Sequence, residues 1–298
     1  MEPISTQAAS AAFKVGKEVT SPVSKSIGQT LSDVWYSNYG YKWSEKRQKK
    51  EIEVAHNIEK FKEDIKSKAN KIPDENRQEP DIDIVGSALD AAKFRTNKQE
   101  IRGMFASLIA AAMDSSKSDD IHPSFSEMIK MLSPLDAKNL HYLYTTSDET
   151  ISKIRITYDK GFTDVYNNIY LGNPEVNDNQ LIAPSIDNLA RLKLVDVTYD
   201  TFKINDALYD KHRNNPLFLE YKQKQEKRRK NLLDTLNFLK SGGKIVDSNS
   251  PDPLPEEIQS VMKKLLEEGL ESSTIDIVKG TISLTDLGRN FCKVCLSE

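Results

Sequence analysis

Cysteine is scarce in this chain, which has two among 298 residues. A small secreted scaffold held together by disulfides needs more cysteines, so this class of protein is excluded. No run of ~20 apolar residues occurs, so the sequence predicts no membrane-spanning helix. The N-terminus lacks a basic start followed by an apolar run and a small-residue cleavage site, so we expect no signal peptide. We therefore expect a cytoplasmic protein, with peripheral attachment to the inner face of the membrane as the alternative.

Glycine and proline are also few, with 12 residues of each. Because these residues dominate turns and tight hairpins, their scarcity favours helix. Hydrophobic residues make up 38% of the chain and charged residues 29%, a balance that supports a folded core. We predict a mainly α fold, with a helical N-terminal domain and a smaller α+β, winged-helix-like C-terminal domain.

Three parts are expected along the chain. Residues 1–43 form an amphipathic helical segment, because small apolar residues recur there every three or four positions. Residues 44–145 form a helical core domain, and its helix around Met104 is apolar on much of its circumference, so we expect that helix in the core. Residues 146–298 form the C-terminal domain, with a helical insertion at approximately 205–270.

Local patterns give further expectations for the C-terminal domain. The stretch from Thr145 to Ser147 reads as a linker into it. The segment from Val195 to Ile204 alternates apolar and polar residues and contains β-branched ones, so it is expected as a strand. Near the end, Lys279 and Gly280 are expected to form the turn of a β-hairpin. A final helix should follow, with Thr285 and Asp286 at its start.

The usual signatures of catalysis do not occur. We find no Walker A sequence and no GxGxxG, GxSxG or HExxH pattern. The four histidines are scattered and lack the spacing of metal ligands. Cys292 and Cys295 would share one face of a helix, where burial as small apolar residues is the simplest interpretation and a redox or zinc role is the alternative. We therefore expect a non-enzyme with no cofactor, no metal and no small-molecule substrate.

Two stretches of the sequence together resemble a known family. The second stretch lies near the C-terminus and reads as a strand, a threonine, Leu-Gly and a helix. The first runs from Pro73 to Pro134, and its matching pieces are Asn76-Arg77, Pro80, Gly86, Leu89, Met104-Phe105-Ala106-Ser107-Leu108, Met113-Asp114, His122-Pro123-Ser124-Phe125 and Leu132-Ser133-Pro134. This composite is similar to the bacterial Abi-alpha (abortive infection) family, a domain of unknown function.

The resemblance implies a role in phage defence, in which an infected cell is sacrificed or phage production is blocked. It supplies no catalytic residue. The implied protein acts by binding a protein partner, by self-association or at a membrane surface. Residues 1–43 differ from the glycine-rich, more apolar segment of the family, so membrane association is not carried over by the resemblance.

Four polar residues are the candidates for binding a partner. Asn76, Arg77 and Glu79 occupy a polar loop between two expected helices, and His122 precedes a proline at the start of another. In the functional interpretation Arg77 contacts an anion or a partner, while Asn76 and Glu79 hold it. In the structural interpretation Asn76 and Arg77 bond carbonyl groups left open at helix ends, and His122 serves as a cap or in packing. We expect these residues to share one helix-end surface.

A basic run is the candidate for nucleic-acid binding. It lies on a helix expected from Pro216 to Lys240, and between positions 222 and 230 it has six basic residues and one acid. Such a run could follow a phosphate backbone, whereas its structural interpretation is a solvated helix face. The alternative function is therefore a winged-helix nucleic-acid-binding regulator, and its candidate residues are Lys222, Lys224, Lys227, Arg228, Arg229 and Lys230.

A third candidate surface lies near the N-terminus. Trp35, Tyr36 and Trp43 follow the weakly amphipathic segment and precede several lysines. Aromatic residues beside an amphipathic helix and basic residues suit an anionic membrane surface. Because its apolar face is rich in alanine and valine, which bury little area, packing on the protein itself or on a second copy is the other interpretation.

Overall fold

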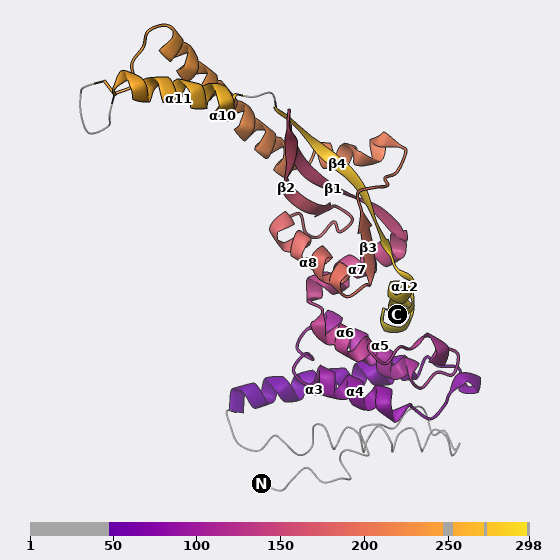
Figure 1. Ribbon diagram of the computed structural model, residues 1–298. Coiled ribbons are helices and arrows are strands. Elements are labelled where there is room, and N and C mark those ends of the chain that lie inside the picture. Colours follow the sequence, from indigo (N-terminus) through magenta and orange to yellow (C-terminus); the bar gives the residue numbers. More distant parts are fainter. Residues whose placement is uncertain (1–47, 247–252, 271–272, 297–298) are drawn as a thin grey trace. The chain divides into compact units, whose positions relative to one another are not determined.

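The computed structural model describes residues 48–246, 253–270 and 273–296 of the chain (Figure 1). The chain divides into two compact units. Of the described residues, unit 1 contains 48–149, 180–196 and 282–296, and unit 2 contains 150–179, 197–246, 253–270 and 273–281. The helices that lie mainly in unit 1 are α3 (Gln48–Ala69), η2 (Asp74–Asn76), α4 (Ile82–Ala92), α5 (Gln99–Ala111), η3 (Ser118–Asp120), α6 (Phe125–Met131), α7 (Pro134–Thr146), α8 (Asn179–Arg191) and α12 (Asp286–Cys295).

Unit 2 holds most of a small, curled antiparallel sheet with the strand order β2-β1-β4-β3. The elements that lie mainly in this unit are β1 (Asp148–Tyr158), β2 (Gly161–Tyr170), η4 (Asp206–Tyr209), α9 (Asp210–Arg213), α10 (Pro216–Lys240), α11 (Glu256–Gly269) and β4 (Ser273–Leu284). Strand β3 (Val195–Thr198) is divided evenly between the two units. The fold is therefore mainly α with an α+β portion, as predicted. Helices α8 and α12 belong to unit 1, although they follow β1 and β2 in the sequence.

The core of unit 1 is built around α5. Every residue from Met104 to Ala111 is buried, and the helix packs against α3, α4, α6, α7 and α12. A helix that is apolar on all sides needs neighbours on all sides, so the predicted core position of this segment is confirmed. The one charged group in the buried part of α5 is Arg102, whose Nε donates to Asp64 on α3 at 2.7 Å and whose Nη1 donates to the carbonyl of Thr96 at 3.2 Å.

Polar side chains fix where the helices of unit 1 begin. Asp81 caps α4 by accepting from the backbone N–H of Asp83 at 2.9 Å. Ser133 and Asp136 form a reciprocal capping box at the start of α7. Thr285 caps α12, where its hydroxyl accepts from the N–H of Gly288 at 2.9 Å. Because such caps satisfy N–H groups that have no partner within the helix, each one sets the first turn.

Helix α12 returns the end of the chain to the core of unit 1. Its start lies so close to the segment after α8 that a Cβ on Gly288 would stand 1.9 Å from the carbonyl oxygen of Leu194. That same oxygen accepts from the N–H of Thr285 at 3.2 Å. Farther along, the ring of Phe291 meets the ring of Phe125 edge to face, with 5.1 Å between the centroids. Because a Cβ at position 288 would overlap the carbonyl of Leu194, this position requires glycine.

The two cysteines lie on the buried side of α12. Cys292 and Cys295 are free thiols with 0% and 1% of their surface exposed. Burial raises the pKa of Cys292 to about 12, and burial together with the neighbouring Cys292 raises the pKa of Cys295 well above its ordinary value. Packing as small apolar residues, the simpler interpretation of this pair, matches their place in the structure.

The predicted linker at the end of α7 is wrong. Helix α7 continues through Thr146, and β1 begins at Asp148. The hydroxyls of Thr145 and Thr146 donate to carbonyls of the preceding turn, to Tyr142 at 2.7 Å and to Leu143 at 3.3 Å. Ser147 then takes a φ of 68°, which turns the chain directly into the strand. Here hydroxyls that favour loops elsewhere support the last helical turn.

Strands β1 and β2 form an antiparallel hairpin that the sequence did not lead us to expect. Their register pairs Ile151 with Tyr170 and Arg155 with Asp164, and it shifts between Ser152 and Arg155 at an irregularity. The predicted strand from Val195 to Ile204 is present but shorter, since β3 ends at Thr198.

The predicted hairpin turn at Lys279 and Gly280 is also wrong, because β4 runs unbroken from Ser273 to Leu284. A Cβ on Gly280 would lie 2.5 Å from the carbonyl oxygen of Thr198 and 2.7 Å from the ring of Tyr199. The hydroxyl of Tyr209 donates to the carbonyl of Gly280 at 2.8 Å. The glycine thus permits a close approach within an extended strand and does not make a turn.

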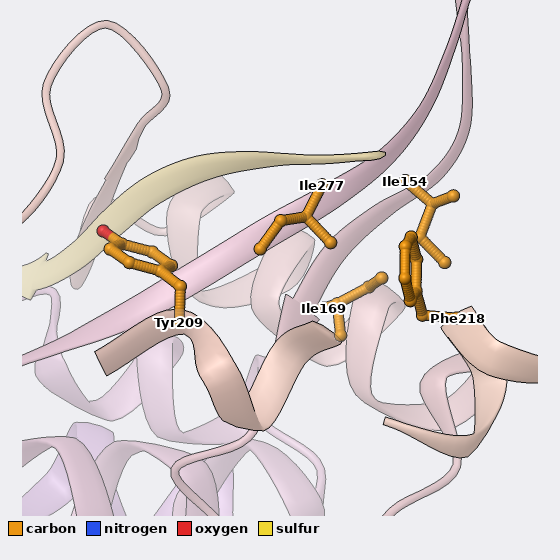
Figure 2. Close-up of a cluster of buried hydrophobic side chains, with 5 residues drawn as sticks. All are labelled: Ile154, Ile169, Tyr209, Phe218 and Ile277. Atoms are coloured by element: carbon orange, nitrogen blue, oxygen red, sulfur yellow. The ribbon is translucent and has the colours of Figure 1, made fainter. Parts of the chain in front are cut away.

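One face of the sheet carries the core of unit 2. Figure 2 shows Ile154, Ile169 and Ile277 on the strands facing Tyr209 and Phe218 from the helical segment that follows β3. All five side chains are at most 8% exposed. Since side chains alternate between the faces of a strand, the neighbours of Ile154 on β1, which are Lys153 and Arg155, belong to the opposite face.

We predict that Gly288→Ala lowers the free energy of unfolding by about 3 kcal/mol, because a methyl group there overlaps a backbone carbonyl that cannot move aside alone. The matched control is Gly86→Ala inside α4, where an added Cβ meets no neighbouring atom within 4 Å. Alanine is the better helix former, so this control should gain about 1 kcal/mol. Urea unfolding followed by circular dichroism measures both. Equal stabilities for the two variants would contradict the described docking of α12.

We also predict that neither thiol of the folded chain reacts with iodoacetamide at pH 8. The thiolate is the reacting form, and burial keeps both cysteines protonated and covered. In urea both should be labelled, and mass spectrometry counts the added groups. Rapid labelling of the folded chain at Cys292 or Cys295 would show that α12 does not cover them.

Candidate functional site

The loop with Asn76 and Arg77 is tied to the end of α5. The carbonyl of Asn76 accepts from the N–H of Ser115 at 2.8 Å, and the N–H of Gln78 donates to the carbonyl of Met113 at 3.0 Å. Arg77 forms an isolated antiparallel bridge with Asp114. The backbone of this loop is therefore held in one place, next to the turn that follows α5.

The side chain of Arg77 is bonded to residues just before it in the chain. Its Nε donates to the carbonyl of Ile72, just beyond the end of α3, at 3.2 Å, and lies 3.3 Å from a carboxylate oxygen of Asp74. The side chain is 15% exposed. It satisfies a carbonyl of the loop that follows α3, and the same position leaves only a small part of the side chain accessible from outside.

Gln78 takes a role in this loop that we did not assign from the sequence. Its side-chain Nε2 donates to the carbonyl of Ala112 at 3.2 Å and to the hydroxyl of Ser118 at 2.7 Å. It thereby joins the loop to the segment that leads into His122. The only signal in the sequence was its place between Arg77 and Glu79. That position does not tell whether the amide of Gln78 is bonded within the chain or faces water.

His122 is exposed and serves the start of α6. Its Nδ1 accepts from the N–H of Ser124 at 3.2 Å and lies 2.7 Å from the hydroxyl of the same serine. Its ring lies 6.0 Å from that of Phe125. Since Gln78 bonds Ser118, four residues before the histidine, the two parts of the predicted partner-binding set lie on linked loops of unit 1. Glu79 is exposed on the first of these loops.

The six basic candidates on α10 are all exposed, and they divide into two groups. Four other residues of the helix, Gln225, Asn231, Leu232 and Thr235, line an open hollow of about 550 Å³. Three of the basic residues, Lys224, Lys227 and Arg228, line this hollow with them. The other three, Lys222, Arg229 and Lys230, do not. The structure therefore brings together half of the predicted nucleic-acid-binding set on one side of the helix.

A cluster of charged and aromatic residues lies on the sheet face opposite the core of unit 2. Arg155 donates to the carboxylate of Asp164 through Nε at 2.6 Å and Nη2 at 3.0 Å, and Lys153 donates to it at 3.3 Å. These bonds, first of all those from Arg155, hold the pKa of Asp164 below its ordinary value. The guanidinium of Arg155 stacks 3.6 Å from the ring centroid of Phe162, and Lys153 lies 4.3 Å from that of Tyr199.

A second ion cluster joins η4 to β4. Asp206 accepts from Arg213 at 3.1 Å and from Lys279 at 2.8 Å. The hydrogen bond from Arg213, followed by that from Lys279, lowers the pKa of Asp206 to about 2. The ammonium group of Lys279 also lies 4.6 Å from the ring centroid of Phe202. This cluster keeps Lys279 in the position where a turn was expected.

His212 is the one histidine found beside hydroxyl groups in the interior of unit 2. Its Nδ1 lies 2.9 Å from Ser152 Oγ and its Nε2 lies 3.0 Å from Thr150 Oγ1. A serine beside a histidine is the pair that nucleophilic catalysis uses. All three residues are at most 1% exposed, so no substrate reaches them, and the bonds instead anchor α9 to β1.

Among the described residues, none of the helices combines the length and the apolar character that crossing a bilayer requires. The same residues contain no group of three or more His, Cys, Asp or Glu side chains placed to hold a metal ion. Trp35, Tyr36 and Trp43, the candidates for contact with a membrane surface, lie outside the described residues.

Comparison with protein families gives a match over most of the chain. Neither the curated proteins nor the solved structures include a match to this chain. The profile of the family described as "Abortive infection alpha" matches residues 53–295, which include all the helices from α4 to α12 and all four strands. Because the match extends over both compact units and most of the sequence, the chain belongs to the abortive infection alpha family.

Proposed function

We propose that this protein is a non-enzymatic phage-defence protein of the abortive-infection type. The observation that carries the proposal is the family match over residues 53–295. In this proposal the chain acts through contacts with a protein partner or a membrane surface. The exposed Glu79 and His122 on linked loops of unit 1 support this mode of action, because they are polar groups that a partner can reach.

If the chain has this function, bacteria that express it should restrict at least one phage. Efficiency of plating on a broad phage panel should fall for the sensitive phage, and cultures infected at high multiplicity should collapse before phage is released. Equal plating with and without the chain across the panel would contradict the proposal. The test variant combines Glu79→Lys with His122→Ala on the loops. The control variant is Glu63→Lys on the exposed side of α3. Only the test variant should lose protection against phage.

A second candidate function is nucleic-acid binding by a regulator with a winged-helix-like C-terminal domain. The hollow lined by Lys224, Lys227 and Arg228 favours it, since clustered cations release counterions when they meet phosphates. The stacking of Arg155 on Phe162 adds an exposed aromatic beside a guanidinium on the same unit. Aromatic rings and cations combined in this way suit single-stranded nucleic acid.

This candidate predicts binding that weakens steeply with salt. Replacing Lys224, Lys227 and Arg228 with serine should reduce the slope of log affinity against log salt by about 2.7 if three phosphate contacts to duplex DNA are lost. The control replaces Lys222, Arg229 and Lys230 with serine, which removes the same charge outside the hollow. Fluorescence anisotropy with duplex and single-stranded oligonucleotides measures both variants. Equal losses in the two variants, or no binding by the unchanged chain, would rule out the hollow as the binding site.

A further inference from the structure

Helix α11 carries an apolar arc wider than the part that its own chain covers. At about 100° per residue, Ile258, Val261, Met262, Leu265 and Leu266 fall on one arc of roughly 140°. Met262 and Leu266, on one side of this arc, are half-buried. Ile258, Val261 and Leu265, on the other side, are 47%, 59% and 59% exposed. We call these three residues the α11 edge.

The covered side of the arc faces α10, within the same unit. Leu236 of α10 is buried, and a Cβ on Gly269 would lie 3.8 Å from Leu232, at ordinary packing distance. Lys240 of α10 pairs with Glu267 of α11 at 3.0 Å. Figure 1 shows the two helices lying against each other as a hairpin, with α11 in lighter orange than α10. Helix α10 covers only part of the arc, and the side chains of the α11 edge stay exposed in the part of the chain that the structure describes.

This exposure is costly for a helix of this size. Helix α11 has 14 residues and none of them is fully buried. Isolated helices of ~12–15 residues are marginal in water, and helices in proteins gain most of their stability from packing an apolar face. A two-helix hairpin that presents a further apolar edge is half of a four-helix arrangement, in which a second hairpin completes the core.

The charges near the α11 edge indicate which kind of partner can bind it. Helix α10 has seven Lys or Arg against three Asp or Glu, and α11 has four Glu against two Lys. Glu257 and Glu268 fall beside the α11 edge on the helical wheel, so an anionic membrane surface would be repelled there. A basic helix would be attracted, and the same hairpin carries one, with Leu233 47% exposed on it and Arg229 one turn before that leucine.

We propose that the α11 edge is a self-association surface, on which the α10–α11 hairpin of a second copy of this chain packs. In a two-fold pair each copy offers the same patch, so the acidic α11 of one copy lies against the basic α10 of the other in both halves of the interface. Ile258, Val261 and Leu265 form its apolar centre, and the glutamates and basic residues form its rim.

Sedimentation equilibrium of the full chain tests the proposal. The unchanged chain should approach twice the mass of one chain as its concentration rises. Val261→Glu with Leu265→Glu should raise the dissociation constant by roughly 10-fold or more, because charges then enter the centre of the interface. The control is Ser260→Glu with Lys264→Gln, which makes the same change in charge at exposed positions outside the edge and should leave the dimer intact. A chain that stays monomeric, or an edge variant that dimerises as well as the control, overturns the proposal.

Hydrogen exchange of the unchanged chain gives a readout that does not depend on the folding of any variant. Amides of α11 should exchange more slowly as the chain concentration rises, because dimerisation shields the helix and suppresses its opening. Protection that is strong but independent of concentration would place a segment of the same chain on the edge, and it would overturn self-association. A rise in protection that is confined to other helices would place the contact elsewhere, and it would also overturn self-association at the α11 edge.

Discussion

A helix buried on every side is the constraint on which unit 1 depends. From Met104 to Ala111 α5 has no face for water, so the chain must supply neighbours all round it. Four of these, α3, α4, α6 and α7, come from the same part of the sequence, but α12 comes from the far end of the chain. The close contact of Gly288 with the carbonyl of Leu194 and the meeting of Phe291 with Phe125 are the means by which that distant helix is held.

The helices could be predicted where a single physical cause determines them. Apolar periodicity located α5, the charged segment from Pro216 to Lys240 was expected as the helix that is α10, and Thr285 located the start of α12. The sheet could not be predicted as well, because its signals are ambiguous over short stretches. Gly280 looks like a turn residue until the carbonyl of Thr198 is seen beside it, and this contact joins residues 82 positions apart.

The candidate surfaces were predictable in composition but not in geometry. The sequence identified six basic residues on α10, yet only the folded helix separates Lys224, Lys227 and Arg228 from the other three. Arg77 was foreseen as either a partner contact or a group that bonds carbonyls at helix ends, and the structure shows its Nε bonded to the carbonyl of Ile72, in the loop that follows α3. The cluster around Asp164 was missed because β1 and β2 were not foreseen, although Lys153 and Arg155 alternate with isoleucines as in a strand with one buried face.

The return of α12 to unit 1 also determines when that unit can be completed during synthesis. The ribosome makes the residues of α5 well before those of α12, and Phe291 follows its partner Phe125 by 166 residues. At about 5–20 residues per second this interval is on the order of ten seconds. All of unit 2 emerges within it. The unit whose synthesis begins first is therefore the last to close its core, and until then the nascent chain exposes to water the side of α5 that α12 will cover.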